Sequence, residues 1–424
     1  MLTINFIREN TALVIEKLGI KNFESNEVIS KIIETDKKRR ALQLESDNRQ
    51  AEMNTLSKQI GDLFKAGKKD EAETARQKTA TLKDEIKTLT QNLEVIEGEL
   101  QNLLIQVPNL PHESVPRGKS AEDNIEVRSG GIIPRLHDGA IPHWELAKKY
   151  GIIDFDLGTK LTGAGFPVYK NKGSKLQRAL INFFLDENEK AGYTEYWPPL
   201  MVNADSAFGT GQLPDKEGQM YHITLDNFYL IPTAEVPVTN IYRDVILDAK
   251  ELPVKCTAYT PCFRREAGSY GKDVRGLNRV HQFDKVEIVQ IQHPEKSYET
   301  LEEMVSHVEA ILSKLELPYR IVKLCGGDMS FTSALTYDFE VFSAAQQRWL
   351  EVSSVSNFES YQANRLKLRF RDETTKKTQL AHTLNGSSLA LPRIVAALLE
   401  NNQTEKGIII PGVLRKYTGF DSIA

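Results

Sequence analysis

A long polar stretch that contains no proline before Pro108 constrains the fold more than any other feature of the sequence. In its second half, small and apolar residues recur at alternating spacings of three and four, which places them in one stripe along a helix. Such a stripe predicts a coiled-coil seam. The seam positions are Ala72, Ala75, Thr79, Leu82, Ile86, Leu89, Leu93, Ile96, Leu100 and Leu103. The first half carries a weaker seam at Val28, Ile32, Thr35, Arg39, Leu42, Ser46, Arg49, Met53, Leu56, Ile60 and Leu63.

A glycine-containing turn at residues 65–70 separates the two seams. Gly67 ends the first helix readily, and Asp70 is placed to cap the second. Two helices joined by so short a turn run antiparallel, so the stretch predicts a helical hairpin, here called the arm. At about 1.5 Å per residue the arm is roughly 55 Å long. A short helical lead is expected before it, in residues 1–25, with Ile7, Val14, Ile15 and Leu18, closed by Gly19.

Two functions fit the arm when only its residues are considered. It is either a dimerisation coiled coil or a surface for nucleic acid. Folding back at Gly67 and the polar seam residues Arg39 and Arg49 weaken the dimerisation interpretation. Basic residues at 37–40 and the lysines at the tip offer partners for phosphates, although a basic run on a helix is usually only a solvated face.

Composition places the chain among globular proteins of more than one domain. It has 424 residues, 40% of them hydrophobic and 26% charged, with a net charge of −4. This mild acidity means that any contact with nucleic acid must come from local basic patches. Its cysteines, Cys256, Cys262 and Cys325, show no C-x-x-C spacing, which argues against a structural zinc and fits a reducing compartment. No membrane-spanning run or signal peptide is visible, so we expect a cytoplasmic protein.

Beyond the arm, Pro108, Pro111 and Pro116 form a linker, and the rest of the chain predicts a sheet. Few helices separate the predicted strands, which favours an antiparallel sheet over a parallel one. The sequence therefore predicts an α+β protein. Strands are expected around 228–231, 254–259, 280–291, 336–342, 351–356 and 379–384, and helices at 175–190, 297–315, 361 onward and 389–402.

One hairpin in this region has unusual chemistry. Residues 262–287 have strand-like ends and a connecting loop that is both glycine-rich and cationic. A basic loop between paired strands suits a polyanion such as a nucleotide phosphate or the end of a nucleic acid, but it is also compatible with an ordinary solvated loop. The residues concerned are Gly268, Ser269, Gly271, Gly276, Arg265, Lys272, Arg275 and Arg279.

Four further segments stand beside this hairpin and decide between the alternatives. They are IPTAE at 231–235, LCGGDM at 324–329, EVSSVSN at 351–357 and LNGSSLALPR at 384–393. With them, the chain closely resembles the bacterial-type seryl-tRNA synthetases, which are class II aminoacyl-tRNA synthetases. The resemblance implies an antiparallel two-helix coiled-coil arm in an N-terminal tRNA-binding domain, residues 1–108. A class II catalytic domain, an antiparallel sheet flanked by helices, would follow in residues 109–424.

The resemblance also implies a reaction, in which serine is activated with ATP and then transferred to tRNA. Arg264 would lie between the α-phosphate and the serine carboxylate, and Arg393 would bind the γ-phosphate. Arginine suits both roles because its planar fork meets an anion with two hydrogen bonds and keeps its charge. Glu351 and Ser354 would hold Mg²⁺, a cation that prefers oxygen ligands. The complete ATP site implied is Arg264, Arg265, Glu266, Val280, Phe283, Glu351, Val352, Ser353, Ser354 and Arg393.

Serine recognition requires anchors for an ammonium and a hydroxyl group, with little space beyond them. By resemblance Glu287 is the partner of the hydroxyl, and a site built around that bond rejects alanine because its polar groups would be left unpaired. The whole serine site implied is Thr233, Ala234, Glu235, Arg264, Glu287, Asn385 and Ser387.

The partners implied are tRNA(Ser), L-serine, ATP and a second copy of the chain. The homodimer would form at the predicted helix 175–190 and the strand that ends at Pro198 or Pro199, a pattern that an ordinary core helix and edge strand would also give. Whether a selenocysteine tRNA, tRNA(Sec), is charged as well stays open. Some residues depart from the family pattern and leave the motion of the hairpin loop and its contact with the tRNA open: Arg265, Tyr270, Asn364 and Pro392.

Two alternative functions compete with serine–tRNA ligase. One is a synthetase-like amino acid:carrier-protein ligase, but those relatives lack the arm, which this chain has. The other is a regulatory paralogue without catalysis, and the presence of Arg264, Glu351 and Arg393 argues against it.

Overall fold

The computed structural model describes residues 1–267 and 275–424, which form two compact units. The first unit comprises residues 1–19 and 23–108, and the second comprises residues 20–22 and 109–424. Part of the cationic loop predicted above lies outside the described residues, namely Gly268, Ser269, Tyr270, Gly271 and Lys272.

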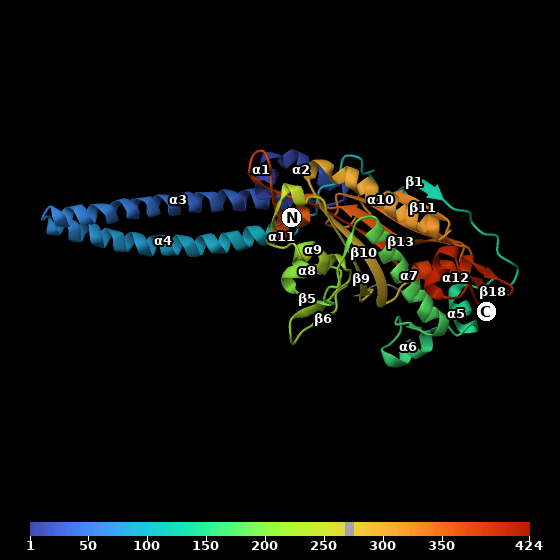
Figure 1. Ribbon diagram of the computed structural model, residues 1–424. Coiled ribbons are helices and arrows are strands. Elements are labelled where there is room, and N and C mark those ends of the chain that lie inside the picture. Colours follow the sequence, from blue (N-terminus) through green and yellow to red (C-terminus); the bar gives the residue numbers. More distant parts are fainter. Residues whose placement is uncertain (268–274) are drawn as a thin grey trace. The chain divides into compact units, whose positions relative to one another are not determined.

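Two long helices, α3 (Asn26–Lys65) and α4 (Lys69–Leu104), form the arm of the first unit (Figure 1). Gly67 lies between them with a φ of +73°, a left-handed conformation that glycine adopts without strain. The predicted cap is wrong: α4 begins at Lys69, with no side-chain cap, and Asp70 lies in its first turn. The lead is two helices, α1 (Ile4–Glu9) and α2 (Thr11–Ile20), and the second continues one residue past Gly19.

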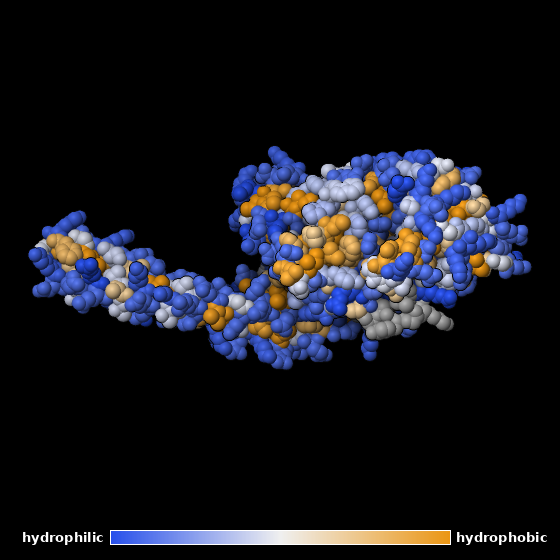
Figure 2. Space-filling view, turned by 90° about the horizontal axis from the view of Figure 1, so that it is seen from below, coloured by the Kyte–Doolittle hydropathy of each residue, from blue (hydrophilic) through white to orange (hydrophobic). Residues whose placement is uncertain are grey.

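The seam of the arm is confirmed, because every predicted seam position is buried or half-buried. Figure 2 shows that hydrophilic residues cover most of the remaining surface of the arm. Near the base of α3, the buried Asp36 carboxylate accepts hydrogen bonds from Arg8 and Arg39 at 3.0 and 2.9 Å. These arginines, with Arg40, hold the pKa of Asp36 below its usual range against the opposing effect of burial.

An eight-stranded sheet forms the framework of the second unit, and its strand order is β1-β11-β12-β13-β16-β10-β9-β4. All neighbouring strands are antiparallel except β4 and β9, so the predicted antiparallel class is confirmed. The strands are β1 (Ile125–Gly130), β4 (Thr194–Glu195), β9 (Val254–Phe263), β10 (Gln282–Gln292), β11 (Tyr319–Lys323), β12 (Leu335–Ser343), β13 (Arg348–Asn357) and β16 (His382–Ala390).

Three helices bury one face of this sheet (Figure 1): α7 (Asn171–Lys190), α10 (Ser297–Lys314) and α12 (Leu391–Asn401). Alternation along β10 divides its side chains between the two faces. Val286 and Ile288 join the large apolar core beneath the helices, whereas Glu287 points to the opposite face. Because packing of the apolar side chains fixes the position of β10, it also fixes the polar side chains that alternate with them along the strand.

Shorter elements surround the sheet. The remaining helices are α5 (His143–Lys149), α6 (Phe155–Leu161), α8 (Ala204–Thr210), α9 (Glu235–Asn240), α11 (Ser360–Leu366) and α13 (Arg415–Thr418). The remaining strands are β2 (Ile153–Asp154), β3 (Val168–Tyr169), β5 (Met201–Asn203), β6 (His222–Ile223), β7 (Phe228–Leu230), β8 (Ile246–Asp248), β14 (Arg369–Arg371), β15 (Thr378–Leu380), β17 (Gln403–Thr404), β18 (Gly407–Ile409) and β19 (Ser422–Ile423). In the part of the chain that the structure describes, no helix is both long and apolar enough to cross a membrane.

Candidate active site

A cluster of buried polar side chains lies on the face of the sheet opposite the large core, around Glu287 of β10. The Glu287 carboxylate is 2.5 Å from the Lys285 ammonium, and the Thr233 hydroxyl donates to it at 3.4 Å. Lys285 also donates to the Thr233 hydroxyl at 2.8 Å. Both charged side chains are almost fully buried, at 6% and 2% exposure. The opposite charges of Lys285 and Glu287 therefore compensate each other, and this part of the cluster is polar with little net charge.

Glu235, at the start of α9, is a second buried carboxylate in this cluster. Its backbone N–H donates to the Thr233 hydroxyl at 3.2 Å, and its side chain accepts from the Gln362 amide at 2.6 Å. Burial, together with the nearby charge of Glu287, raises the pKa of Glu235 to about 7, although Gln362 and Lys285 act in the opposite direction. Among the described residues Glu235 forms no ion pair, so its negative charge lacks a direct counter-ion.

Strand β16 contributes two of the predicted residues, Ser387 and Asn385, to the cluster. Ser387 is paired in register with Glu287, and its hydroxyl donates to that carboxylate at 3.5 Å. Asn385 is two residues earlier on the same face, and its amide lowers the pKa of Glu235. Ala234 is fully buried in a small apolar cluster, so its side chain is packed among apolar neighbours. The structure thus brings the predicted serine-site residues of β10, β16 and α9 together.

Arg264 immediately follows β9 and is held from two sides. Its Nε donates to the Pro232 carbonyl at 3.3 Å, and its guanidinium lies over the Phe283 ring, 5.3 Å from the centroid. Stacking on an aromatic face fixes the plane of the guanidinium while leaving its terminal N–H groups to bind an anion. Since the same backbone segment, residues 231–235, carries Thr233 and Glu235, Arg264 lies next to the buried polar cluster around Glu287.

Three further residues predicted for the ATP site, Glu266, Val280 and Arg265, differ in their burial and contacts. Glu266 has a φ of +47° and forms an ion pair with Arg279 at 3.0 Å. Val280 is buried. Arg265 is exposed, and its backbone N–H donates to the Gln219 carbonyl at 2.9 Å.

A cavity of about 280 Å³ surrounds Arg393 in the first turn of α12. Arg393 Nε donates to the Asn278 carbonyl at 2.9 Å, and its Nη1 donates to the Glu351 carbonyl at 2.7 Å. Two backbone carbonyls therefore orient the guanidinium at this predicted strand-to-helix junction. The cavity is lined by Asn278, Arg279, Glu340, Arg348, Trp349, Leu350, Glu351 and Arg393.

The predicted magnesium ligands Glu351 and Ser354 lie on β13 beside an acidic residue of β12. The Ser354 hydroxyl donates to Asp338, with which it is paired in register. Burial raises the pKa of Asp338, and the charge of Glu351 raises it further. Two carboxylates and a hydroxyl with excess negative charge fit Mg²⁺, which usually binds one or two carboxylates together with substrate phosphates. The described residues contain no cluster of three or more His, Cys, Asp or Glu side chains that would hold a metal without a substrate.

Val352 and Ser353, which lie between Glu351 and Ser354 in sequence, use their side chains in structural contacts. The Val352 side chain belongs to the apolar core, so only its backbone is available to a ligand. Ser353 uses its hydroxyl to donate to the Ser387 carbonyl at 2.6 Å, which ties β13 to β16. Their assignment to the ATP site stays a prediction from the resemblance, and the contacts of their side chains are structural.

Three site residues were missing from the sequence-based prediction: Lys285, Gln362 and Asp338. A signal for Lys285 was present, because Lys285 and Glu287 carry opposite charges on either side of Val286, in a segment predicted as a strand. Charged residues are rarely fully buried unless they are paired, so this pattern indicates a functional pair. Asp338 alternates with apolar residues in β12 in the same way. Gln362 carries no such signal, because it lies in a short helix far away in sequence.

The comparisons with known proteins cover the whole chain. Residues 1–111 match the family model of the seryl-tRNA synthetase N-terminal domain, and residues 221–402 match that of the tRNA synthetase class II core domain (G, H, P, S and T). The N-terminal match argues against the carrier-protein alternative. A serine–tRNA ligase from Salinibacter ruber is 50% identical, with 100% of this chain and 99% of that one covered. One from Chlorobaculum parvum is 48% identical, with both chains fully covered.

Solved structures agree with these sequence matches. Seryl-tRNA synthetase from Pyrococcus horikoshii, solved in complex with ATP, has a TM-score of 0.88 and 34% identity, covering 100% of this chain and 99% of that one. A cytoplasmic serine–tRNA ligase from Naegleria fowleri, in complex with AMP, has a TM-score of 0.87 and 26% identity, covering 100% and 98%. Identity and coverage at this level leave one conclusion: the chain belongs to the seryl-tRNA synthetase family.

Proposed function

We propose that this enzyme binds L-serine between Glu235 and Glu287 and activates it with ATP held by Arg264 and Arg393. The observation that carries the assignment is the unequal compensation of the two buried carboxylates. Glu287 is neutralised by Lys285, so it suits the uncharged hydroxyl of serine, whereas Glu235 lacks a direct counter-ion and suits the ammonium. Serine-dependent exchange of pyrophosphate into ATP by the purified protein tests this function, and its absence would contradict it.

The activation step requires no catalytic base, because its nucleophile is already a carboxylate. A serine carboxylate oxygen attacks the α-phosphorus, the bond to pyrophosphate breaks, and seryl-adenylate forms. A hydroxyl of the terminal tRNA ribose then attacks the seryl carbonyl, the bond to AMP breaks, and the hydroxyl proton leaves with the departing AMP or to solvent. Arg264 orients both anions and stabilises the charge that develops at phosphorus. Glu351 and Ser354, with Asp338 beside them, would hold Mg²⁺, which neutralises phosphate charge when bound.

We also propose the partners and compartment implied by the family. The arm binds the tRNA body, tRNA(Ser) is the substrate, and tRNA(Sec) is a second candidate substrate. The enzyme works in the cytoplasm. A homodimer is supported by the exposed Trp197 and Met201 beside Pro198 and Pro199, since exposed apolar side chains mark association sites. Sedimentation equilibrium measures the oligomeric state, and charging of purified tRNA(Ser) and tRNA(Sec) transcripts measures the tRNA specificity.

Serine binding is expected to strengthen as the pH rises through about 7, because that is the raised pKa of Glu235. Below this pH the carboxyl is protonated and neutral, so it no longer attracts the serine ammonium. The KM for serine should rise about tenfold for each pH unit below 7, following the titration of one group. Pyrophosphate exchange between pH 6 and 8 measures it. Glu235→Gln should raise the KM and abolish its pH dependence; an unchanged titration in this variant would contradict the assignment.

Replacement of Glu287 by glutamine is expected to reduce discrimination between serine and alanine more than it reduces ATP binding. The carboxylate of Glu287 is the proposed partner of the serine hydroxyl, and a site built to bond a hydroxyl loses about 100-fold or more in selectivity without it. The ratio of kcat/KM for serine to that for alanine measures the effect. Because the change leaves Lys285 buried without its partner, Glu287→Gln/Lys285→Met is the matched control. An unchanged ratio in both variants would show that another residue bonds the hydroxyl of serine.

A further inference from the structure

Helix α5 carries none of the predicted site residues. Its first three residues, His143, Trp144 and Glu145, contact residues 275–277, which directly precede Asn278 in the wall of the cavity around Arg393. The Arg275 guanidinium lies over the Trp144 ring, 4.8 Å from its centroid, and 4.0 Å from a Glu145 carboxylate oxygen. The next contact is made by His143, whose Nε2 accepts from the Leu277 N–H at 2.8 Å. His143 and Leu277 are both fully buried. Residues 275–277 are therefore held against the start of α5.

The hydrogen bonds of His143 define the tautomer of its ring. Since Nε2 accepts from the Leu277 N–H, the proton of the neutral ring lies on Nδ1. That nitrogen is 2.6 Å from the Glu400 carboxylate, which also accepts from the His143 backbone N–H at 2.9 Å. Glu400 is fully buried, and it receives further hydrogen bonds from Gln346 and Ser343. The imidazole therefore links a buried carboxylate to a backbone amide in one defined tautomer.

Glu400 and Arg393 are seven residues apart on α12, so they lie on the same face of the helix, roughly 10 Å apart. Both hold the segment Leu277–Asn278. Arg393 Nε donates to the Asn278 carbonyl at 2.9 Å, and Glu400 reaches Leu277 through His143. A second link leads from Glu400 through Gln346 to the Asn278 side chain, with both hydrogen bonds at 2.9 Å. The carbonyl that orients Arg393 is thus itself positioned by His143.

We propose that His143 is a positioning residue for ATP: through Leu277 it holds the Asn278 carbonyl that orients Arg393. This inference rests on the proposed binding of ATP by Arg393. It differs from a purely structural role, in which the buried pair of His143 and Glu400 would only stabilise the fold. The space around the ring is tight, because a Cβ on Gly276 would lie 2.3 Å from His143 Nε2. Small changes at either residue therefore displace Leu277.

Two substitutions of His143 separate the two hydrogen bonds of the ring. In His143→Gln, the side-chain oxygen can replace Nε2 and accept from the Leu277 N–H, while the bond from Nδ1 to Glu400 is lost. In His143→Asn, the amide nitrogen can replace Nδ1 and donate to Glu400, while the Leu277 N–H is left unpaired. Each variant loses one hydrogen bond, so a purely structural role predicts similar losses of thermal stability and similar kinetics.

Positioning predicts a different result in pyrophosphate exchange. His143→Asn should raise the KM for ATP about tenfold or more, as expected for a buried donor left without a partner, and leave the KM for serine within about threefold. His143→Gln should stay within about threefold of the unmodified enzyme in both constants. His382→Asn is the control for loss of a half-buried imidazole elsewhere; it retains a donor toward Ser297, which His382 contacts at 2.8 Å.

Equal changes in the two His143 variants, or a rise in the KM for serine as large as that for ATP, would overturn the inference. If neither variant folds, as judged by thermal melting, Gly276→Ala provides the test, because its Cβ forces the His143 ring and the backbone before Leu277 apart while both His143 and Glu400 are kept. An unchanged KM for ATP in that variant would overturn the inference as well. Absence of serine-dependent exchange in the unmodified enzyme would instead contradict the proposed function.

Discussion

Replacement of Arg264 by alanine is expected to reduce serine-dependent pyrophosphate exchange about a thousandfold, without loss of the fold. Arg264 is held by the Pro232 carbonyl and the Phe283 ring, so its terminal N–H groups are available where the serine pocket meets the proposed α-phosphate position. Two anions must approach each other there, and without the guanidinium they repel each other in a site that excludes water. The loss should appear in kcat/KM for both substrates, because the interaction is strongest in the transition state.

Arg264→Lys separates charge from geometry in this experiment. Lysine keeps the positive charge but has neither the planar fork nor the stacking surface, so exchange should remain at least tenfold below that of the unmodified enzyme. Arg128→Ala is the matched control, because Arg128 is also a partly exposed arginine, paired with Glu302 and Glu309 at the edge strand β1. It should leave exchange nearly unchanged. Near-normal exchange in Arg264→Ala would refute the role assigned to this residue.

Sequence alone predicted those parts of the structure that depend on local periodicity. Seam residues of α3 and α4 were identified correctly along the whole arm, because a coiled coil repeats one simple contact. Strands with apolar alternation, such as β10 and β12, were also predicted. The edge strand β1 was missed; it is short, and its side chains, including Ile125 and Val127, are mostly exposed. The predicted strand at 193–199 is only the two-residue β4, since prolines at 198 and 199 cannot extend the pairing.

The candidate site was harder to predict where its contacts depend on tertiary structure. Resemblance supplied Glu287, but the pairing of its carboxylate with Lys285 depends on how β10 is buried. Likewise, His143 and Glu400 lie more than 250 residues apart in sequence and meet only because α5 packs on α12. Buried polar pairs are satisfied by partners that no local pattern reveals.

Shortening the arm is expected to abolish charging of tRNA while leaving serine activation intact. Ion pairs of Arg49 with Glu85 and of Glu52 with Lys78 show which residues face each other across α3 and α4. Residues near 41 and 92 are therefore opposite, and a short glycine-rich turn can join them. This deletion keeps the buried base of the arm, including Ile32 and Asp36, so the first unit should still fold.

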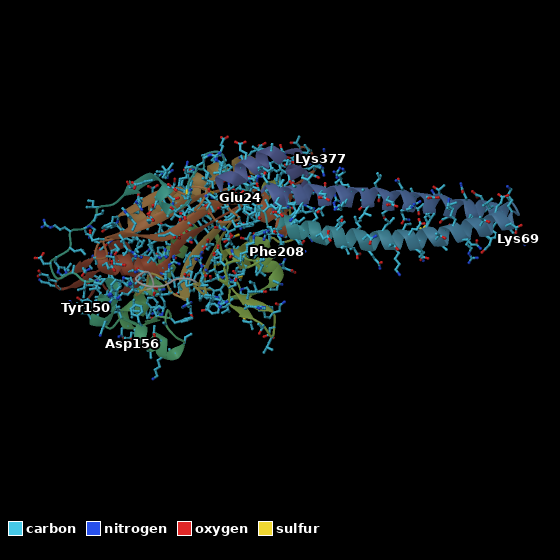
Figure 3. The ribbon with its side chains drawn as sticks, turned by 180° about the vertical axis from the view of Figure 1, so that it is seen from behind. Glu24, Lys69, Tyr150, Asp156, Phe208 and Lys377 are labelled. Carbon is cyan, nitrogen blue, oxygen red and sulfur yellow. The ribbon has the colours of Figure 1, made fainter. Side chains whose placement is uncertain are left out.

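Aminoacylation should fall more than about 100-fold in the shortened enzyme, because the loss of several phosphate contacts weakens binding by orders of magnitude. Pyrophosphate exchange should stay within about twofold, since the proposed serine and ATP residues all lie in the second unit. Figure 3 labels Lys69 at the tip of the arm, where Lys65 and Lys68 are its close neighbours in sequence. Glutamine at all three positions is the matched control, because it keeps the arm's length but reduces the salt dependence of tRNA binding. Loss of exchange together with charging would show that the arm is structural, and full charging by the shortened enzyme would show that tRNA binds elsewhere.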